Sequence, residues 1–419
     1  MTSSNRPSAG RRASGPGTPN RQAWRDDRLL QAGFLVGTAL GAAATVIGRR
    51  AEKAARRGLV DWSQAERIAI GRLRNAPGAL TPEELRATEP EYAAAMALIV
   101  PRLSQALGTE LPGVVERAGV TDRAGWVRAN VTTFAQLIGT LEDELLDQVM
   151  PAGGGLGKAT MALANRWVTT RQLGILLGFM GQRVLGQYDL AMLSAEIAPG
   201  RLLFVEENVR MTARALDVPL VPFRMWIALH ETTHAFEFEA HPWLRPYLAG
   251  RLERQLALFG RDARGFGRDA MRGLGRALRG EGDGGHWMEQ LMGEEQRRLF
   301  RETQAVMSLL EGFSDYVMDD VGKELVPGVE RISARFHERR TRRTPFERAM
   351  LRITGMDLKM EQYRKGEAFV AGIERLGGAA ALRKLWDGPE TLPTSDEIDD
   401  PPRWVRRMGL NLVGGGGAR

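Results

Sequence analysis

The sequence predicts a mainly α fold of the α+β kind, in which a large helical domain carries a small β element beside one central helix. Helical caps and apolar helical periodicity recur along most of the chain, as in Thr81-Pro-Glu-Glu-Leu85, with its N-cap threonine and first-turn proline. The segment Met225–Phe236 is apolar except for the string His-Glu-Thr-Thr-His, whose spacing suits a helix. The run Leu202–Val205 just before it is the best strand candidate.

The composition is that of one large or two ordinary globular domains. The 419 residues are 43% hydrophobic, and the absence of cysteine excludes disulfides, thiolate zinc ligands and cysteine nucleophiles. The net charge of +7 invites a nucleic-acid interpretation. Much of the excess lies in the N-terminal tail and in residues 261–279, without a nucleic-acid motif, so we expect no specific nucleic-acid partner. We expect a cytoplasmic protein, because cysteine-free chains fit a reducing compartment. The oligomeric state stays open.

The N-terminal residues differ in composition from the rest of the chain. Residues 1–24 are rich in Ser, Gly, Pro and Arg and are predicted to form a disordered basic tail. Residues 25–56 form a Gly/Ala-rich segment, in which residues 29–48 run without a charge over a length that could span a bilayer. Glycines at every fourth position form a GxxxGxxxG ridge there. Two interpretations stay open: a membrane-associated helix, or a soluble helix that packs or oligomerises through its small residues.

The folded domain is predicted to cover residues 57–408, followed by a flexible Gly-rich C-terminus at 409–419. The apolar stretch 172–185 contains three glycines and predicts a tightly packed internal helix, because the arginines that bracket it leave too few residues for a membrane span. Residues 260–285 are punctuated by glycine and predict a mobile loop.

The string His230-Glu231-Thr-Thr-His234 predicts a metal site on a helix. Histidines four residues apart project from one face and can bind one zinc ion, while Glu231 is offset to reach a metal-bound water as a general base. With 5 histidines and 51 acidic residues in the chain, chance would produce such a string only about 0.01 times. The alternative without a metal site is a core helix with two incidental histidines. Against it, the motif supplies the only ionisable residues of its apolar segment.

A catalytic zinc site needs a third protein ligand and one open position. His241 follows His234 by seven residues, whereas the metzincin pattern requires a glycine at 237 and a histidine at 240, where this chain has Glu237 and Ala240. Proline follows His241 directly. We therefore expect His241 to end the helix rather than to bind metal.

The stronger candidate for the third ligand is Glu311, in the apolar, helix-like run Met307–Met318. Glu311 and Asp315 share a face at i, i+4, so the first carboxylate can bind zinc while the second accepts the other ring N–H of a ligand histidine. This resembles the ExxSD half of the thermolysin-like gluzincin motif, although the two halves are much further apart here. The alternative, an acidic pair on a solvated face, is disfavoured by the apolar residues around it.

Several further segments resemble those of one family. They are Val60–Trp62, Asp122–Trp126 with Asn130, Val184–Asp189, Leu203–Asn208, Trp226–His234, Leu310–Gly312 with Val317–Asp319, and Leu358–Tyr363. On these segments the chain resembles the actinobacterial and Chloroflexi zincin-like metallopeptidases of the DUF2342 type, also described as F420-biosynthesis-associated hydrolases. The resemblance implies a zincin-like metal site with His230 and His234 as zinc ligands, Glu231 as base and Glu311 as third ligand. It supplies no substrate and implies no F420 site.

The expected activity is zinc-dependent hydrolysis of a peptide or other amide, so the expected partner is a peptide or protein substrate. The strand at Leu202–Val205 could receive that peptide by β-augmentation. An oxyanion donor is also needed, and the available candidates are Tyr363, Tyr316, His286 and His337. Two alternatives stay open: a metal-binding protein without proteolytic activity, such as a small-molecule amide hydrolase, and a membrane-tethered scaffold.

Overall fold

The computed structural model describes residues 58–149, 156–188, 201–255, 257–258, 293–341 and 356–410. The predicted tail, the Gly/Ala-rich helix, the loop at 260–285 and the end of the flexible C-terminus lie outside the described residues. The chain divides into two compact units, of which residues 57–152 and 164–419 form the larger one. This larger unit contains the sheet and the motif helix.

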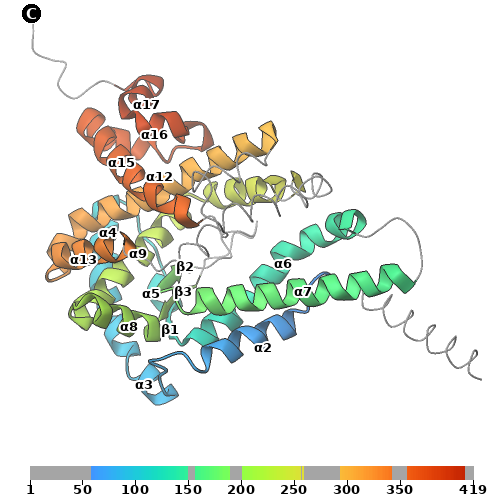
Figure 1. The fold of residues 1–419 in the computed structure, drawn as a ribbon. Helices are drawn as coiled ribbons and strands as arrows, with labels where there is room; N and C mark the ends of the chain where they lie inside the picture. The colour runs from blue at the N-terminus through green and yellow to red at the C-terminus, as the bar shows by residue number, and fades with distance from the viewer. Residues whose placement is uncertain are drawn as a thin grey trace, which may run out of the picture. The chain divides into compact units, whose positions relative to one another are not determined.

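Helices make up most of the described chain, which confirms the mainly α prediction (Figure 1). In chain order they are α2 (Trp62–Leu73), α3 (Pro82–Arg86), α4 (Glu89–Leu107), α5 (Val114–Arg117), α6 (Arg123–Val149), α7 (Leu156–Gly181), α8 (Glu206–Leu216), α9 (Leu220–Ala240), α12 (Glu294–Leu325), α13 (Val329–Thr341), α15 (Met356–Lys384), the 3-10 turn η2 (Pro389–Thr391), α16 (Ser395–Asp399) and α17 (Pro401–Arg407). A further helix covers residues 244–255. The predicted cap of α3 is present, because the Thr81 hydroxyl accepts from the Glu84 N–H and the Glu84 carboxylate accepts from the Thr81 N–H.

The small β element is a three-stranded sheet with the order β1-β3-β2, made of β1 (Ala118–Thr121), β3 (Leu202–Val205) and β2 (Gly186–Tyr188). Strand β3 pairs parallel with β1 and antiparallel with β2. The strand predicted at 202–205 is therefore present, but the expectation that it receives a peptide is wrong. Both of its edges are already paired and its four residues are buried. Strand β2 lies at an edge of this sheet and packs against α9.

The helix α9 lies at the centre of the larger unit, between α4 and α12. Most of its side chains are apolar, and Phe223, Leu229 and Phe236 are at most 1% exposed. A helix with so many apolar side chains is stable when neighbouring elements cover most of its surface. Burial of each such side chain stabilises the fold by about 1.5–3 kcal/mol. The metal motif therefore lies on one of the most firmly held elements of the chain.

Two glycines set the distance between α12 and α15, which lie side by side (Figure 1). A Cβ on Gly366 would lie 1.8 Å from the Ser308 carbonyl oxygen, and one on Gly312 would lie 2.1 Å from the Gly366 carbonyl carbon. The two backbones are thus in direct contact, which a residue with a side chain does not permit. Gly312 directly follows Glu311, so this crossing holds the turn of α12 that carries Glu311.

Residues 172–181 of the glycine-containing stretch form the last turns of α7, which are tightly packed as predicted, whereas residues 182–185 lie beyond the end of the helix. Cβ atoms on Gly174 and Gly178 would lie 2.8 Å and 3.2 Å from the carbonyl oxygens of Ala65 and Ala69 in α2. The helix ends at Gly181, and strand β2 follows within a few residues. The sequence did not predict this strand.

The possible membrane helix at residues 29–48 lies outside the described residues. Within the part of the chain that the structure describes, no helix combines the length and the apolar character needed to cross a bilayer.

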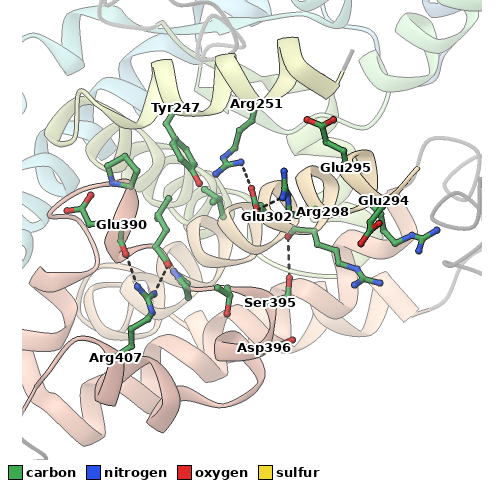
Figure 2. Close-up of a pocket in the computed structure, with 17 residues that line it drawn as sticks. Tyr247, Arg251, Glu294, Glu295, Arg298, Glu302, Glu390, Ser395, Asp396 and Arg407 are labelled. Carbon is green, nitrogen blue, oxygen red and sulfur yellow. Dashed lines mark hydrogen bonds and ion pairs between the residues drawn. The ribbon is translucent and has the colours of Figure 1, made fainter. Parts of the chain in front are cut away.

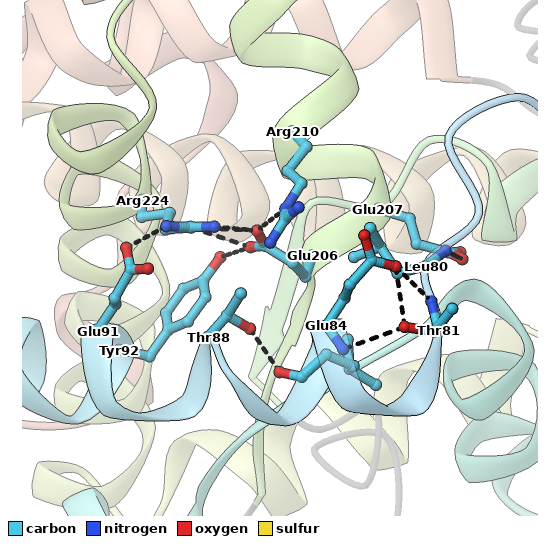
Figure 3. A network of polar contacts seen from close by, with 11 residues as sticks. Leu80, Thr81, Glu84, Thr88, Glu91, Tyr92, Glu206, Glu207, Arg210 and Arg224 are labelled. Atoms are coloured by element: carbon cyan, nitrogen blue, oxygen red, sulfur yellow. Dashed lines mark hydrogen bonds and ion pairs between the residues drawn. The ribbon is translucent and has the colours of Figure 1, made fainter.

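A buried ion network anchors the first turns of α9 to α8 and α4 (Figure 3). Arg224 donates to both carboxylate oxygens of Glu206 at 3.2 Å and also contacts Glu91. Arg210 and the Tyr92 hydroxyl donate to the same carboxylate, which is fully buried. A buried charge is tolerated only when it is paired and hydrogen-bonded. The network therefore fixes the rotation of α9 less than two turns before the motif.

Candidate metal centre

The motif residues occupy the middle of α9. Thr232 and Thr233 are buried, and their hydroxyls donate to the carbonyls of Ala228 and Leu229 one turn back. His230 and His234 project from another face of the helix and remain partly exposed. The motif thus places its threonines on a buried face of α9 and its histidines on a face that a metal ion or substrate can reach.

His241 ends the helix, as predicted. It is the C-cap of α9, and its Nδ1 donates to the Glu237 carbonyl at 2.7 Å. Its ring stacks on Trp386 with the centroids 4.6 Å apart. These contacts give His241 a structural place at the helix end, separate from the two motif histidines.

The helix α12 brings Glu311 to the motif histidines. The Oε2 atom of Glu311 lies 3.8 Å from Nε2 of His230 and 3.8 Å from Nε2 of His234. One atom from each of the three side chains lies within 4.8 Å of the others, a grouping that could hold a metal ion. The structure therefore brings together the three ligands predicted from distant parts of the sequence.

The three side chains fit a zinc ion. Zinc bonds to histidine nitrogen and carboxylate oxygen are about 2.1 Å long, so tetrahedral neighbours lie about 3.4 Å apart. The two 3.8 Å separations from Glu311 Oε2 need a closure of a few tenths of an ångström, and all three ligand atoms lie within 4.8 Å of one another. Two histidines and one carboxylate form a donor set of catalytic zinc sites, which leave a fourth position open.

Each motif histidine is held through the ring nitrogen that faces away from Glu311. Glu237 Oε2 lies 2.7 Å from His234 Nδ1, and Ser314 Oγ lies 3.1 Å from His230 Nδ1. A histidine that binds metal through Nε2 carries its proton on Nδ1, so these oxygens accept that proton and fix the ring. The contacts of these two residues with the histidine rings were not predicted from the sequence. Helical spacing could have indicated them, because Glu237 follows His234 by three residues and Ser314 follows Glu311 by three.

Asp315 is predicted to orient a ligand histidine. It lies on α12 one turn after Glu311, close enough to act on Glu237. Burial raises the pKa of Glu237 to about 7, and the charges of Glu311 and Asp315 add to the rise against the opposing charge of His234. The oxygen atoms within hydrogen-bonding distance of the two Nδ1 atoms belong to Glu237 and Ser314, and Met318 Sδ also lies 3.2 Å from His230 Nδ1. The orienting role of Asp315 stays a prediction.

Glu231, the predicted base, is held against strand β2. The Tyr188 N–H donates to Glu231 Oε2 at 3.1 Å. Burial raises the pKa of Glu231 to about 7, and the Glu311 charge adds to the rise, whereas His234 and the Tyr188 N–H oppose it. A carboxylate with a pKa near neutrality can both take up and release a proton under physiological conditions.

The pKa of His234 is also displaced. Burial by itself lowers it, but the carboxylates of Glu237 and Glu311 outweigh burial and raise the pKa well above its ordinary value. Histidine binds metal in its neutral form. A metal ion at this centre would therefore compete with a proton for His234.

A cavity of about 240 Å³ opens onto these groups. His230, Glu231, His234 and Glu311 all line it, together with the three residues of β2. Its remaining wall is apolar and consists of Trp126, Met180, Val184, Phe238, Met307 and Leu310. A mostly apolar pocket with a few convergent polar groups is typical of a substrate site.

Side chains from α6 hold strand β2 in place. Trp126 Nε1 donates to Gln187 Oε1 at 2.6 Å, and Gln187 Nε2 donates to Asn130 Oδ1 at 2.7 Å. Both ends of the Gln187 amide are therefore in use. Any shift of the strand that supports Glu231 would break these bonds.

Nearly all of the described chain matches one known family. The sequence profile of the zincin-like metallopeptidases matches residues 60–405. The chain belongs to the zincin-like metallopeptidase family. It is also similar to a crystal structure from Chloroflexus aurantiacus, described as "a putative hydrolase with a novel fold", with 35% identity and a TM-score of 0.62 over 84% of this chain and 99% of that chain. No curated protein matches the chain.

Membership confirms the family resemblance and the zincin-like fold predicted from the motifs. Family membership also supports hydrolase activity and agrees with zinc as the metal. The side chains of His230, His234 and Glu311 form a group that could hold such an ion. Strand β2 lies within Val184–Asp189, one of the segments on which the family resemblance rests. This resemblance was the signal in the sequence that pointed to Gly186 and Tyr188.

A larger cavity of the zincin-like domain, drawn in Figure 2, shares no lining residue with the cavity at the metal centre. It has a volume of about 1040 Å³ and contains none of the predicted site residues. Many of its charges are paired: Arg251 contacts Glu302, and Arg407 binds both carboxylate oxygens of Glu397 and the Glu390 carbonyl. We assign this cavity no part in catalysis.

Only one of the four predicted oxyanion candidates has a described side chain. Tyr316 lies five residues after Glu311, which turns it to another face of α12, where it lines a different cavity and bonds to Glu374. The expectation is therefore wrong for Tyr316. The side chains of His286, His337 and Tyr363 lie outside the described residues.

Proposed function

We propose that this zincin-like protein is a zinc-dependent metallopeptidase that hydrolyses a peptide or amide bond with Glu231 as general base. The observation that carries the proposal is that the base and the three metal-ligand candidates all line one small cavity. The family membership supports the hydrolase class.

His230, His234 and Glu311 would hold the zinc ion. Zinc bound there would lower the pKa of a coordinated water and polarise the substrate carbonyl. Glu231 would take a proton from the attacking water and pass it to the leaving amine. The Tyr188 N–H keeps the Glu231 carboxylate in position throughout.

The cavity walls support an apolar peptide substrate. Among the described residues strand β2 pairs with β3 alone, and the Tyr188 N–H on its other side is taken by Glu231. The remaining backbone groups on that side could bind an extended peptide and bring its carbonyl past Glu231. The apolar wall opposite suits one large aliphatic or aromatic side chain next to the cleaved bond. The role that we expected of β3 thus belongs to β2 in this proposal.

The placement of Glu231 favours hydrolysis over metal binding without catalysis. Structural zinc sites are closed by four protein ligands and need no base. Here three ligand candidates leave one side open to a cavity, and a carboxylate that is not a ligand candidate faces the same space. This arrangement suits a water molecule that is to be activated.

Metal analysis combined with product comparison tests the proposal. Native protein should contain about one zinc ion per chain. Glu231→Gln should keep the metal but lose about 10²–10⁴-fold in turnover on a peptide library. Glu253→Gln makes the same chemical change at an exposed position and should cleave like the wild type. Native protein without zinc, or equal cleavage by wild type and Glu231→Gln, contradicts the proposal.

A further inference from the structure

The side chain of Tyr188, the last residue of strand β2, is bound to residues outside the sheet. Tyr188 is 2% exposed, and its hydroxyl donates to Glu239 Oε1 at 2.7 Å and accepts from Arg245 Nη2. Glu239 lies in the last turn of α9, and Arg245 lies in the helix that covers residues 244–255. An arginine can only donate and an ionised carboxylate can only accept, so the hydroxyl uses both of its roles. The end of β2 is therefore fixed by this side chain as well as by its pairing with β3.

Glu239 is itself held by an arginine. Arg117 Nη2 lies 2.8 Å from Glu239 Oε1 and 2.7 Å from Oε2, and both side chains are at most 22% exposed. Hydrogen bonds between charged groups are stronger than neutral ones, and a partly buried ion pair is screened less than one on the surface. Arg117 belongs to α5, directly before β1. Glu239 thus ties the last turn of α9 to α5 and, through the Tyr188 hydroxyl, to β2.

Tyr188 bridges two glutamates of the same helix. Its N–H donates to Glu231 Oε2 at 3.1 Å, and its hydroxyl donates to Glu239. These glutamates lie about 12 Å apart along α9, so the backbone of Tyr188 cannot move along the helix without stretching one of the two bonds. Among the described residues that line the cavity at the metal centre, Glu231 is present and Glu239 is not. An influence of Glu239 on the base would therefore pass through Tyr188.

We propose that Glu239 is a positioning residue for the general base: by holding the Tyr188 hydroxyl, it keeps the Tyr188 N–H against Glu231. This inference rests on the proposed role of Glu231 in hydrolysis. The amide of Gln187 binds the middle of β2 to α6, but the N–H that reaches Glu231 belongs to the next residue. Without Glu239 the end of the strand loses its tie to α9, and the N–H leaves the carboxylate oxygen for part of the time. The base is then displaced, whereas the metal-ligand candidates and the apolar wall stay in place.

Amide exchange in the full-length protein tests this coupling without any substrate. Glu239→Leu keeps the bulk of the side chain but gives the Tyr188 hydroxyl no acceptor, so the amide at residue 188 should exchange with deuterium at least about tenfold faster than in the wild type. Tyr188→Phe removes the same hydrogen bond from the other side and should act alike. Glu324→Leu is the matched control, because it takes a carboxylate from another arginine, Arg102 of α4, and should leave this amide unchanged. Unchanged exchange in either folded variant overturns the proposal.

Steady-state kinetics test the consequence, on a peptide that the wild type cleaves and Glu231→Gln does not. Glu239→Leu should lower kcat about 10–100-fold, with KM within about twofold and the zinc content of the wild type, because only the base is displaced. Glu239→Gln should recover most of kcat, since its amide oxygen still accepts from the Tyr188 hydroxyl. A raised KM with unchanged kcat, or equal losses in Glu239→Gln and Glu239→Leu, overturns the positioning role. A wild type that cleaves no peptide contradicts the proposed function alone, because the exchange result then decides whether Glu239 holds the N–H.

Discussion

Gly186 and Glu231 are in direct contact: a Cβ on Gly186 would lie 2.5 Å from Glu231 Cγ and 2.9 Å from its carboxyl carbon. This close approach lets the N–H of Tyr188, two residues further along β2, reach Glu231 Oε2 at 3.1 Å. The base and the strand edge therefore form one unit. In the proposed mechanism, a substrate aligned along that edge would therefore be aligned with Glu231 as well.

Gly186→Ala should displace Glu231 without touching the three metal-ligand candidates. We expect turnover to fall about 100-fold, because a shift of about 1 Å in a catalytic group has effects of this size, while the zinc content stays near that of the wild type. Steady-state kinetics and elemental analysis measure the two quantities. Gly71→Ala is the matched control, since a Cβ there meets nothing within 4 Å. Unchanged turnover in Gly186→Ala would show that the contact is not needed.

Glu237→Gln should lower zinc affinity about 10–100-fold, because the carboxylate that holds His234 Nδ1 becomes an uncharged amide. Competition with a chromophoric chelator gives the affinity. Ser314→Ala should have a smaller effect at His230, since it removes a neutral acceptor. Asp315→Asn tests whether Asp315, as well as Glu237, orients a histidine ring. If it weakens zinc binding as strongly as Glu237→Gln, then Asp315 has the orienting role that the sequence predicts.

Gly366→Ala should destabilise the protein by at least about 2 kcal/mol, because its Cβ would overlap the Ser308 carbonyl oxygen and force α12 and α15 apart. The displacement should also move Glu311 and lower zinc affinity. Urea unfolding of wild type and variant, each with and without zinc, measures both effects. A variant as stable as the wild type would mean that the two helices can separate without cost.

The metal-free protein should lose stability as the pH rises from 5 to 8. Glu231 holds its proton up to about pH 7 in the folded state, against an ordinary pKa of 4.5, so the folded protein binds more protons than the unfolded chain in that window. The raised pKa of His234 acts in the same direction at higher pH. The contribution of Glu231 is on the order of 2 kcal/mol.

Urea unfolding of EDTA-treated protein across this range measures the trend, and the difference between wild type and Glu231→Gln isolates one carboxyl group. Zinc should reverse the dependence, because the ligands bind metal in their deprotonated forms. A free energy of unfolding that rises with pH in the metal-free wild type, relative to Glu231→Gln, would contradict the raised pKa.

The sequence by itself determined the features that depend on neighbouring residues. A helix repeats every 3.6 residues, so the spacing of His230 and His234 implied a shared face, and His241 before proline implied a helix end. Glu311 could be selected from the sequence because an apolar run surrounds it.

Only the tertiary structure decided the features that depend on long-range contacts. Four consecutive apolar residues marked β3 as a strand, whereas β1 (Ala-Gly-Val-Thr) and β2 (Gly-Gln-Tyr) have no such apolar pattern, so the strand at the edge was not predicted. The same limit applies to the partners of the histidine rings. Whether Ser314 or Asp315 meets a ring depends on how α12 rotates against α9, and the contact between Gly312 and Gly366 sets the position of α12. Glu237, in contrast, reaches His234 within α9 itself.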